Sequence, residues 1–160
     1  MKEIILTSRG AVAFVDDQDF DRVNALKWYC EPNGKTKYAR HSFFKDGKWR
    51  LQYLHRFILG LETVDRRQID HIDHNGLNCT RSNLRVCSLS ENKKNLKSKK
   101  NSNGFKGVHF SRRENKYQAR ILVDGVSYQS KGYKTPEEAH LAYCELAKKH
   151  HQEFACFESQ

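Results

Sequence analysis

The sequence predicts an α+β protein with an N-terminal scaffold rich in β-strands, a central ββα unit, and a C-terminal three-stranded antiparallel sheet packed on one helix. Three observations indicate this class. Short apolar runs alternate with period two and are separated by turn pairs such as Asp46-Gly47 and Asp124-Gly125. A polar stretch at 68–78 lies between two strand-like runs. Apolar residues recur at helical spacing after Thr135.

The chain is basic, with a net charge of +10 over 160 residues and a sequence pI near 9.5. This excess favours a polyanionic partner, because a cationic face gains free energy when it releases condensed counterions. A basic soluble protein with no nucleic-acid role is the alternative. No apolar run approaches the roughly 20 residues of a membrane helix. We therefore expect no membrane partner.

The five cysteines form no C-x-x-C pair, so a cysteine-ligated zinc site is not expected. The first residues turn polar too quickly for a secretion signal. An odd number of cysteines without such a signal favours reduced thiols in a cytoplasmic protein.

Residues 1–53 are predicted to form the β-rich scaffold. Two short strands within 3–15 precede a capped helix, in which Phe20, Val23 and Leu26 recur at helical spacing. The pair Asp46-Gly47 predicts a hairpin. The basic residues of this region either contact phosphates or form a solvated hairpin face. They are Arg40, His41, Lys45, Lys48 and Arg50.

Residues 54–96 are predicted to form the central unit. A buried helix ends at Gly60 and has His55 at its start, and we favour a structural role for this histidine over a catalytic one. A strand over 69–72, a turn at Asn75-Gly76 and a return strand over 84–87 follow. A helix through about position 96, capped by Ser88 or Ser90, completes a ββα pattern.

The central unit also holds the residues that phosphodiester cleavage requires, namely a base for water and groups that stabilise charge. His71 can be a neutral base near pH 7. Asp70 and Asn92 can offer hard oxygen ligands, and Asn83 can hold the loop and orient His71. Oxygen-rich ligation favours one Mg²⁺ or Mn²⁺ ion over zinc.

The adjacency of Asp70 and His71 imposes a geometric condition, because neighbouring strand residues face opposite ways. The strand must end or bend at His71 if both side chains are to serve one phosphate. Asp73 and His74 are competing candidates for ligand or base. The alternative for the whole stretch is a polar turn whose side chains only bond the backbone.

Residues 93–120 hold ten cations and one acid, a concentration that favours contact with phosphates. The cations are Lys93, Lys94, Lys97, Lys99, Lys100, Lys106, Arg112, Arg113, Lys116 and Arg120. Residues 97–104 contain no apolar side chain and are predicted to be a basic linker that follows the DNA backbone.

Residues 105–160 are predicted to form a second small α+β domain of three strands and one helix. Thr135 caps the helix, with Glu138 three residues later. One face of the sheet is expected to pack the helix through Tyr117, Ala119 and Ile121. The other face carries basic and amide side chains that can read base edges in a major groove. These side chains are Lys106, His109, Arg112, Gln118 and Arg120.

The central unit resembles the HNH nucleases, specifically the phage-type branch related to homing endonucleases. The resemblance implies that Asp70 and Asn92 bind the metal, that His71 is the general base and that Asn83 is structural. The matching segments are Leu54-His55-Arg56, Asp70-His71-Ile72-Asp73, Asn75, Asn83-Leu84-Arg85 and Ser90-Glu91-Asn92.

The chain departs from that family pattern at three positions. Asn92 replaces the histidine that gives the family its third letter, a variant common in the homing branch. His74 stands where glycine is expected, and Cys79 where a second asparagine is frequent.

The C-terminal domain is similar to the APETALA-two/ethylene-response-factor type of DNA-binding domain, which implies a three-stranded sheet laid in the major groove. His109 and Ser111 replace base-reading arginines of the plant members, so we expect a different sequence to be read. The matching segments are Gly107-Val108, Tyr117-Gln118-Ala119-Arg120-Ile121, Lys131-Gly132-Tyr133, Thr135-Pro136-Glu137-Glu138-Ala139 and Ala142-Tyr143.

Together the two resemblances imply a site-recognising, divalent-metal-dependent DNA endonuclease of the homing type that acts on double-stranded DNA. The expected products carry 5′-phosphate and 3′-hydroxyl ends. The expected location is the cytoplasm of a bacterial host, for a phage-encoded protein. Nicking by a monomer and double-strand cutting by a homodimer both stay open. A non-catalytic sequence-specific DNA-binding regulator is the main alternative, and an RNA-directed nuclease a weaker one.

Overall fold

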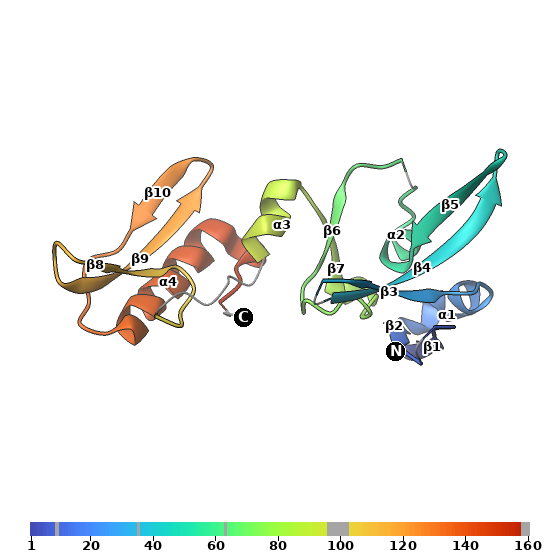
Figure 1. The fold of residues 1–160 in the computed structure, drawn as a ribbon, viewed down its shortest axis with the longest axis horizontal. Helices are drawn as coiled ribbons and strands as arrows, with labels where there is room; N and C mark the ends of the chain where they lie inside the picture. Colours follow the sequence, from blue (N-terminus) through green and yellow to red (C-terminus); the bar gives the residue numbers. More distant parts are fainter. Residues whose placement is uncertain (9, 35, 63, 96–102, 158–160) are drawn as a thin grey trace. The chain divides into compact units, whose positions relative to one another are not determined.

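The computed structural model describes residues 1–8, 10–34, 36–62, 64–95 and 103–157. The chain divides into two compact units, Met1–Leu89 and Ser90–Gln160 (Figure 1). Both units combine helices with small antiparallel sheets, which confirms the predicted α+β class.

Three antiparallel sheets build the first unit. β1 (Lys2–Ile5) pairs with β2 (Val12–Val15), and β6 (Gln68–His71) pairs with β7 (Leu84–Cys87). The third sheet has the order β3 (Tyr29–Asn33), β4 (Thr36–Lys45) and β5 (Lys48–Tyr53). The helices are α1 (Asp17–Asn24), α2 (Leu54–Ile58) and the short 3₁₀ helix η1 (Arg81–Asn83).

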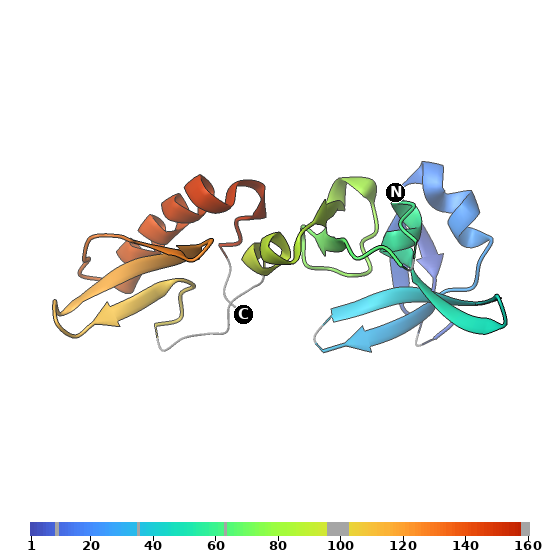
Figure 2. The ribbon, with the colours of Figure 1, turned by 90° about the horizontal axis from the view of Figure 1, so that it is seen from above.

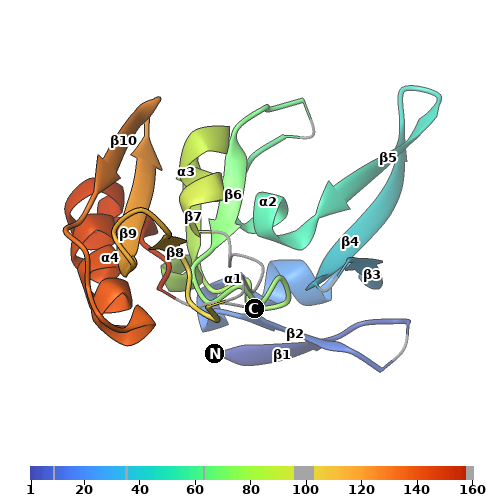
Figure 3. The same cartoon turned by 60° about the vertical axis from the view of Figure 1, so that its left-hand side comes forward.

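The hairpin of β4 and β5 is confirmed at its predicted turn. Asp46 and Gly47 both have positive φ, at 52° and 71°, which is the backbone that a two-residue hairpin turn needs. Lys45 pairs directly with Lys48 across that turn. The hairpin projects away from the rest of the first unit (Figure 3).

One hydrophobic core serves the first unit. It combines residues from the predicted scaffold at 1–53 with residues from the predicted central unit at 54–96. Trp28 is its largest fully buried side chain, and the indole Nε1–H donates to the Val23 carbonyl at 2.8 Å. The core residues are Ile4, Leu6, Ala13, Val15, Val23, Trp28, Cys30, Ala39, Leu54, Ile58, Cys79 and Leu84.

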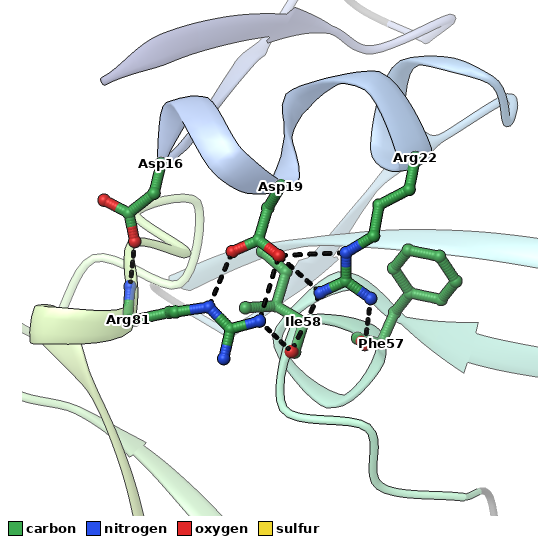
Figure 4. Close-up of polar contacts among 6 residues, drawn as sticks. All are labelled: Asp16, Asp19, Arg22, Phe57, Ile58 and Arg81. Carbon is green, nitrogen blue, oxygen red and sulfur yellow. Dashed lines mark hydrogen bonds and ion pairs between the residues drawn. The ribbon is translucent and has the colours of Figure 1, made fainter.

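A buried carboxylate ties three elements of this unit together (Figure 4). Asp19 on α1 is 2% exposed and accepts hydrogen bonds from Arg22 at 2.5 and 2.9 Å and from Arg81 at 2.8 and 3.0 Å. Both arginines also donate to the carbonyl of Ile58, the last residue of α2. Burial raises the pKa of Asp19, but the bonds from Arg81 and Arg22 outweigh it and hold the pKa below its usual range.

α1 begins directly after Asp16, but the helix lacks the predicted side-chain cap, because the Asp16 side chain makes no cap hydrogen bond. The Asp16 carboxylate instead accepts the backbone N–H of Arg81 at 2.7 Å. The contact therefore reinforces the link between α1 and η1 rather than the helix itself.

In the second unit, the sheet has the order β10 (Val126–Gln129), β9 (Lys116–Val123) and β8 (Val108–Ser111). α4 (Pro136–His151) packs along one face of this sheet (Figure 2). η2 (Gln152–Phe154) follows α4, and α3 (Leu89–Asn95) begins at the boundary between the units. The core residues are Ala119, Ile121, Ala142, Tyr143 and Ala147.

Local sequence rules account for the start of α4 and for one close approach. Thr135 accepts the N–H of Glu138, and the Glu138 side chain accepts the N–H of Thr135, so the predicted capping box is confirmed. Gly107 has a φ of +71°, and a Cβ there would overlap the ring of Tyr143. Glycine is therefore required where the chain enters β8 against α4.

We predict that Asp19→Ala destabilises the first unit by about 2 kcal/mol. Removing one partner of a fully buried ion pair costs about 3–5 kcal/mol, and the cost here is smaller because the Arg22 and Arg81 side chains are 41% and 43% exposed. Chemical denaturation of the wild type and of Asp19→Ala measures the difference in the free energy of unfolding. The control is Asp17→Ala, whose carboxylate is exposed and pairs only with the N-terminus in the described structure, and we expect its unfolding curve to match the wild type. An unchanged curve for Asp19→Ala would contradict the structural role of the network.

Candidate active site

The β6–β7 pair carries the predicted Asp-His pair. β6 ends at His71, which is where the sequence argument required the strand to end. Asp70 pairs with Arg85 across the strands, and His71 pairs with Leu84. Asp70 and His71 are each 6% exposed, so both side chains are shielded from solvent.

Asp70 forms a close ion pair with Arg85. Oδ2 of Asp70 accepts from Nε of Arg85 at 2.8 Å and from Nη2 at 2.6 Å. The two side chains are 7% and 12% exposed, so the pair lies in a region that water screens poorly. The guanidinium therefore fixes the direction of the carboxylate and balances its charge.

The loop after His71 is held against the N-terminal strands. The N–H of Phe14 on β2 donates to Leu77 at 2.8 Å, and its carbonyl accepts from Cys79 at 2.8 Å. Cys79 is fully buried. A Cβ on Gly76 would lie 2.5 Å from the carbonyl oxygen of Lys37 and 2.7 Å from the Tyr38 ring. The loop thus packs directly on β4, with no room for a side chain at position 76.

Asn83 ties the two ends of this loop. Its amide Nδ2 donates to Oδ1 of Asp73 at 2.9 Å and to the carbonyl of Asn78 at 2.8 Å, and its Oδ1 accepts the N–H of Asp73 at 3.0 Å. Asp73 also accepts from Asn75 and Asn78, so its carboxylate is committed to the loop. Through these bonds, the Asn83 side chain joins residues 73 and 78 of the loop.

His74, which stands where the family pattern has a glycine, adopts a left-handed backbone conformation. Its φ is 63°, a conformation that L residues adopt at some energetic cost and glycine adopts more readily.

Four aromatic side chains meet at the end of β6. The Tyr38 ring lies 5.7 Å from His71 and 5.7 Å from His55. His55, on α2, packs edge-to-face on His71 at 5.2 Å and stacks on Tyr53 at 5.5 Å. Within the described residues, Nδ1 of His55 is buried and has no hydrogen-bond partner.

Sequence reasoning missed Tyr38 and Tyr53 as members of the site. They lie on β4 and β5, 33 and 18 positions before His71, so only the tertiary fold brings them to it. The available signal was the alternation of Trp49, Leu51 and Tyr53 along the return strand of the predicted hairpin. His55 joins the site through the same contacts, next to the candidate base.

Both histidines are neutral at pH 7. Burial, with smaller contributions from the nearby His71 and Arg56, lowers the pKa of His55 to about 3. Burial also lowers the pKa of His71 to about 4, although Asp73 and Asp70 act to raise it. A neutral imidazole at position 71 can accept a proton.

Both predicted metal ligands have oxygen atoms, which hard cations such as Mg²⁺ prefer. Asp70 has carboxylate oxygens and lies on β6 in the first unit. Asn92 has an amide oxygen and lies on α3 in the second unit. In the part of the chain that the structure describes, no three His, Cys, Asp or Glu side chains gather to hold a metal. Mg²⁺ does not require such a cluster, because it is commonly bound through one or two protein oxygens together with waters and substrate phosphates.

The predicted DNA-contacting residues lie in the second unit or outside the described residues. Lys97, Lys99 and Lys100 lie outside them, with most of the predicted linker. Lys93, Arg112, Arg113 and Arg120 are exposed, while Lys94, Lys106 and His109 are partly buried. Lys106 donates to the carbonyl of Lys94 at 3.4 Å, and burial lowers its pKa.

Gln118 differs from the other predicted contact residues because it is buried. It is 6% exposed, its Nε2 donates to Glu114 at 2.9 Å and its Oε1 accepts from Gln129 at 2.6 Å. One side chain from the turn before β9 and one from β10 therefore bond the two ends of this amide. Base reading by Gln118 would require these bonds to open.

The fold and the site define a small α+β protein with a buried Asp-His pair at a strand end. An uncharacterized HNH endonuclease, L560 of Acanthamoeba polyphaga mimivirus, is 33% identical to this chain over 151 residues, which span 92% of the chain and 74% of that protein. Protein 3.8 of Escherichia phage T7 is 38% identical over 58 residues, or 36% of the chain and 48% of that protein. No protein-family model and no solved structure matches the chain significantly.

The similarity to L560 spans most of both chains, and the chain therefore belongs to the HNH endonuclease family. The predicted family is confirmed by this relative. No helix within the described ranges is long and apolar enough to cross a membrane.

We predict that Gly76→Ala destabilises the first unit by about 1–3 kcal/mol, the usual cost of overpacking. The added methyl group would meet backbone and a packed ring, so the loop at 72–80 must move away from Tyr38. The control is Gly132→Ala, whose methyl group would meet the side chains of Lys116 and Glu114 instead of backbone. Thermal unfolding compares the two, and equal losses would contradict the close packing at position 76.

We predict that the first unit loses stability as the pH falls from 7 to 5. Unfolding restores the ordinary histidine pKa of 6.5, whereas the folded values are about 3 and 4 for His55 and His71. The unfolded state therefore binds more protons in this window, at a cost of up to about 1.4 kcal/mol per pH unit for each histidine. The comparison is denaturation at several pH values for the wild type and His55→Phe. The variant should show the shallower dependence, and an identical slope would contradict the buried neutral state of His55.

Proposed function

We propose that the chain is a site-recognising DNA endonuclease of the homing type that depends on a divalent metal. The observation that carries this proposal is the buried Asp70-His71 pair at the end of β6, in a chain of the HNH endonuclease family. The neutral His71 imidazole lies beside Asp70 and below a loop that Asn83 holds.

In this proposal the chain's own residues activate water and orient the phosphate. His71 takes a proton from a water whose oxygen attacks the phosphorus in line with the departing 3′ oxygen. The bond from phosphorus to that oxygen breaks, which leaves a 5′-phosphate and a 3′-hydroxyl end. Asp70 and Asn92 would hold a Mg²⁺ or Mn²⁺ ion, one per site, which supplies stabilisation of the charge that develops on the phosphate.

Arg85 has a positioning role in the proposal. Its guanidinium holds Oδ2 of Asp70 through two hydrogen bonds, so the carboxylate cannot rotate freely. Tyr38 and His55 pack against the His71 ring and restrict it in the same way. A preorganised base and ligand avoid the cost of ordering these groups in the transition state.

The second unit would hold the substrate. Its three-stranded sheet, packed on α4, has the order of elements expected of an APETALA-two-like DNA-binding domain. Exposed Arg112, Arg113 and Arg120 would contact double-stranded DNA, together with His109 and the lysines of 93–106. Backbone contacts of this kind set register and orientation, while base contacts set the site that is cut.

A phage relative supports the expectation of a phage-encoded protein that acts in the cytoplasm of a bacterial host. One candidate site per chain makes nicking by a monomer the simplest outcome. Double-strand cutting would need two sites, which a homodimer would supply.

A non-catalytic DNA-binding regulator is the second candidate. Two observations favour it: His71 is only 6% exposed, and Arg85 already occupies Oδ2 of Asp70. A protein of this kind would bind DNA through the same basic residues and cut nothing.

We predict that His71→Ala lowers the rate of plasmid nicking in Mg²⁺ by about a hundredfold or more, the usual contribution of a general base. DNA affinity should be unchanged, because the predicted DNA contacts lie elsewhere. The matched control is His150→Ala on α4, which should nick at the wild-type rate. Gel assays of supercoiled plasmid measure the rates, and gel-shift titration measures binding. Equal nicking by His71→Ala would overturn the assignment of the base. Binding without cleavage by the wild type, in both Mg²⁺ and Mn²⁺, would favour the regulator.

A further inference from the structure

One face of the β3–β4–β5 sheet is lined by aromatic and apolar side chains. Residues that pair directly across antiparallel strands share a face, and alternate residues along a strand return to it. The register pairs Ser42 with Leu51 and Phe44 with Trp49, and it pairs Arg40 with both Tyr29 and Tyr53. We call this surface the aromatic face. Its members are Tyr29, Glu31, Tyr38, Arg40, Ser42, Phe44, Trp49, Leu51 and Tyr53.

The outer half of the aromatic face is exposed. Trp49 is 74% exposed, Phe44 62% and Leu51 46%. The Phe44 and Trp49 rings pack edge-to-face at 5.6 Å on the hairpin that projects from the unit (Figure 3). A group of large apolar side chains left in water marks an interaction surface.

The inner half of the same face reaches the candidate active site. Tyr38 and Tyr53 are the next aromatic members along β4 and β5, and they contact His55, while Tyr38 also contacts His71. From Tyr38 to Phe44 is six residues of strand, or roughly 20 Å at about 3.3 Å per residue. This length of strand separates the exposed half of the aromatic face from the candidate active site.

The charge of this region suits a polyanion. Residues 29–53 contain six lysines or arginines and two acids. Lys45 and Lys48 pair across the hairpin turn, each one position from Phe44 or Trp49 and therefore on the opposite face of the hairpin. Of the two acids, Glu31 is already engaged, because it accepts the Tyr53 hydroxyl at 2.8 Å and pairs with Arg40 at 3.5 Å.

The chemistry of the exposed half favours stacking over the reading of base edges. Reading an edge needs amide or guanidinium groups, whereas Phe44, Trp49 and Leu51 offer rings and an aliphatic chain. Aromatic side chains on a basic sheet are suited to unstacked bases of a single strand. The excess positive charge of residues 29–53 would then attract the phosphates of that strand.

We propose that the aromatic face binds a locally unpaired DNA strand that leads to the scissile phosphate, with bases stacked on Phe44 and Trp49. This inference rests on the proposed nuclease function for the nature of its ligand. It adds a DNA contact in the first unit, separate from the basic residues of the second.

The chain offers a direct probe of this surface, because it has two tryptophans in opposite environments. Trp49 is 74% exposed, whereas Trp28 is 1% exposed in the core. We expect a single-stranded oligothymidylate of ~12 nucleotides, added to the full chain in a chelating buffer, to quench the Trp49 emission. In Trp49→Phe the remaining Trp28 emission should not respond. Quenching that persists in Trp49→Phe, or is absent in the wild type, overturns the proposal.

Affinity measurements test how much the Trp49 and Phe44 rings contribute to binding. Trp49→Ala and Phe44→Ala should each weaken oligothymidylate binding about tenfold. The control is Leu141→Ala, which removes an equally exposed apolar side chain from α4 in the second unit, and its affinity should be unchanged. Unchanged affinity in both aromatic variants overturns the proposal. So does concentration-dependent self-association that is lost in Trp49→Ala, since a second copy would then be the occupant.

The two proposals fail in different ways. The fluorescence and affinity tests require no cleavage. If the wild type cuts plasmid through His71 but oligothymidylate does not change the Trp49 emission, only the aromatic-face proposal fails. A wild type that cuts nothing but shows Trp49 quenching by DNA would remove the nuclease activity and keep the strand-binding face.

Discussion

The carboxylate of Asp19 is buried and accepts hydrogen bonds from Arg22, on the same helix, and from Arg81, which is 62 residues further along the chain. Arg81 begins η1, which ends at Asn83 and runs directly into β7. Because both arginines also bond the last carbonyl of α2, the network fixes the relative positions of α1, α2 and η1 (Figure 4). The N-terminal strands and helices are therefore part of the support for the β6–β7 pair and its loop.

Stability and chemistry make opposing demands on the candidate site. Burial keeps His71 neutral, which a proton acceptor needs, and it also limits the access of DNA to the ring. The Arg85 pair holds Asp70 in place, and it also neutralises a carboxylate that the proposal assigns to a metal. The aromatic face offers a route by which a strand reaches this buried position, since its inner members, Tyr38 and Tyr53, form the wall of the site.

Local signals in the sequence predicted the local parts of the fold. Asp46-Gly47 predicted the hairpin because only a few residues tolerate its backbone, and Thr135 predicted the start of α4 through its capping box. Such local signals could not predict contacts between segments that lie far apart in the sequence. The gathering of Tyr38 and His55 around His71 depends on tertiary packing, and the burial of Gln118 depends on side chains from a turn and a neighbouring strand. The roles of Asp70, Asn83 and Asn92 rest on the chemistry of their side chains and on the family resemblance, and they stay predictions.

The most direct test of the nuclease centre is the mapping of cleavage on a library of random-site duplex DNA, with each strand sequenced at its ends. The wild type in Mg²⁺ should cut at a shared sequence and leave 5′-phosphate and 3′-hydroxyl ends on the cut strand. The same library treated with a His71→Ala protein that still binds DNA should show no cut sites above background. Recovery of intact strands from the wild type, or the same cut sites from the variant, would contradict the account.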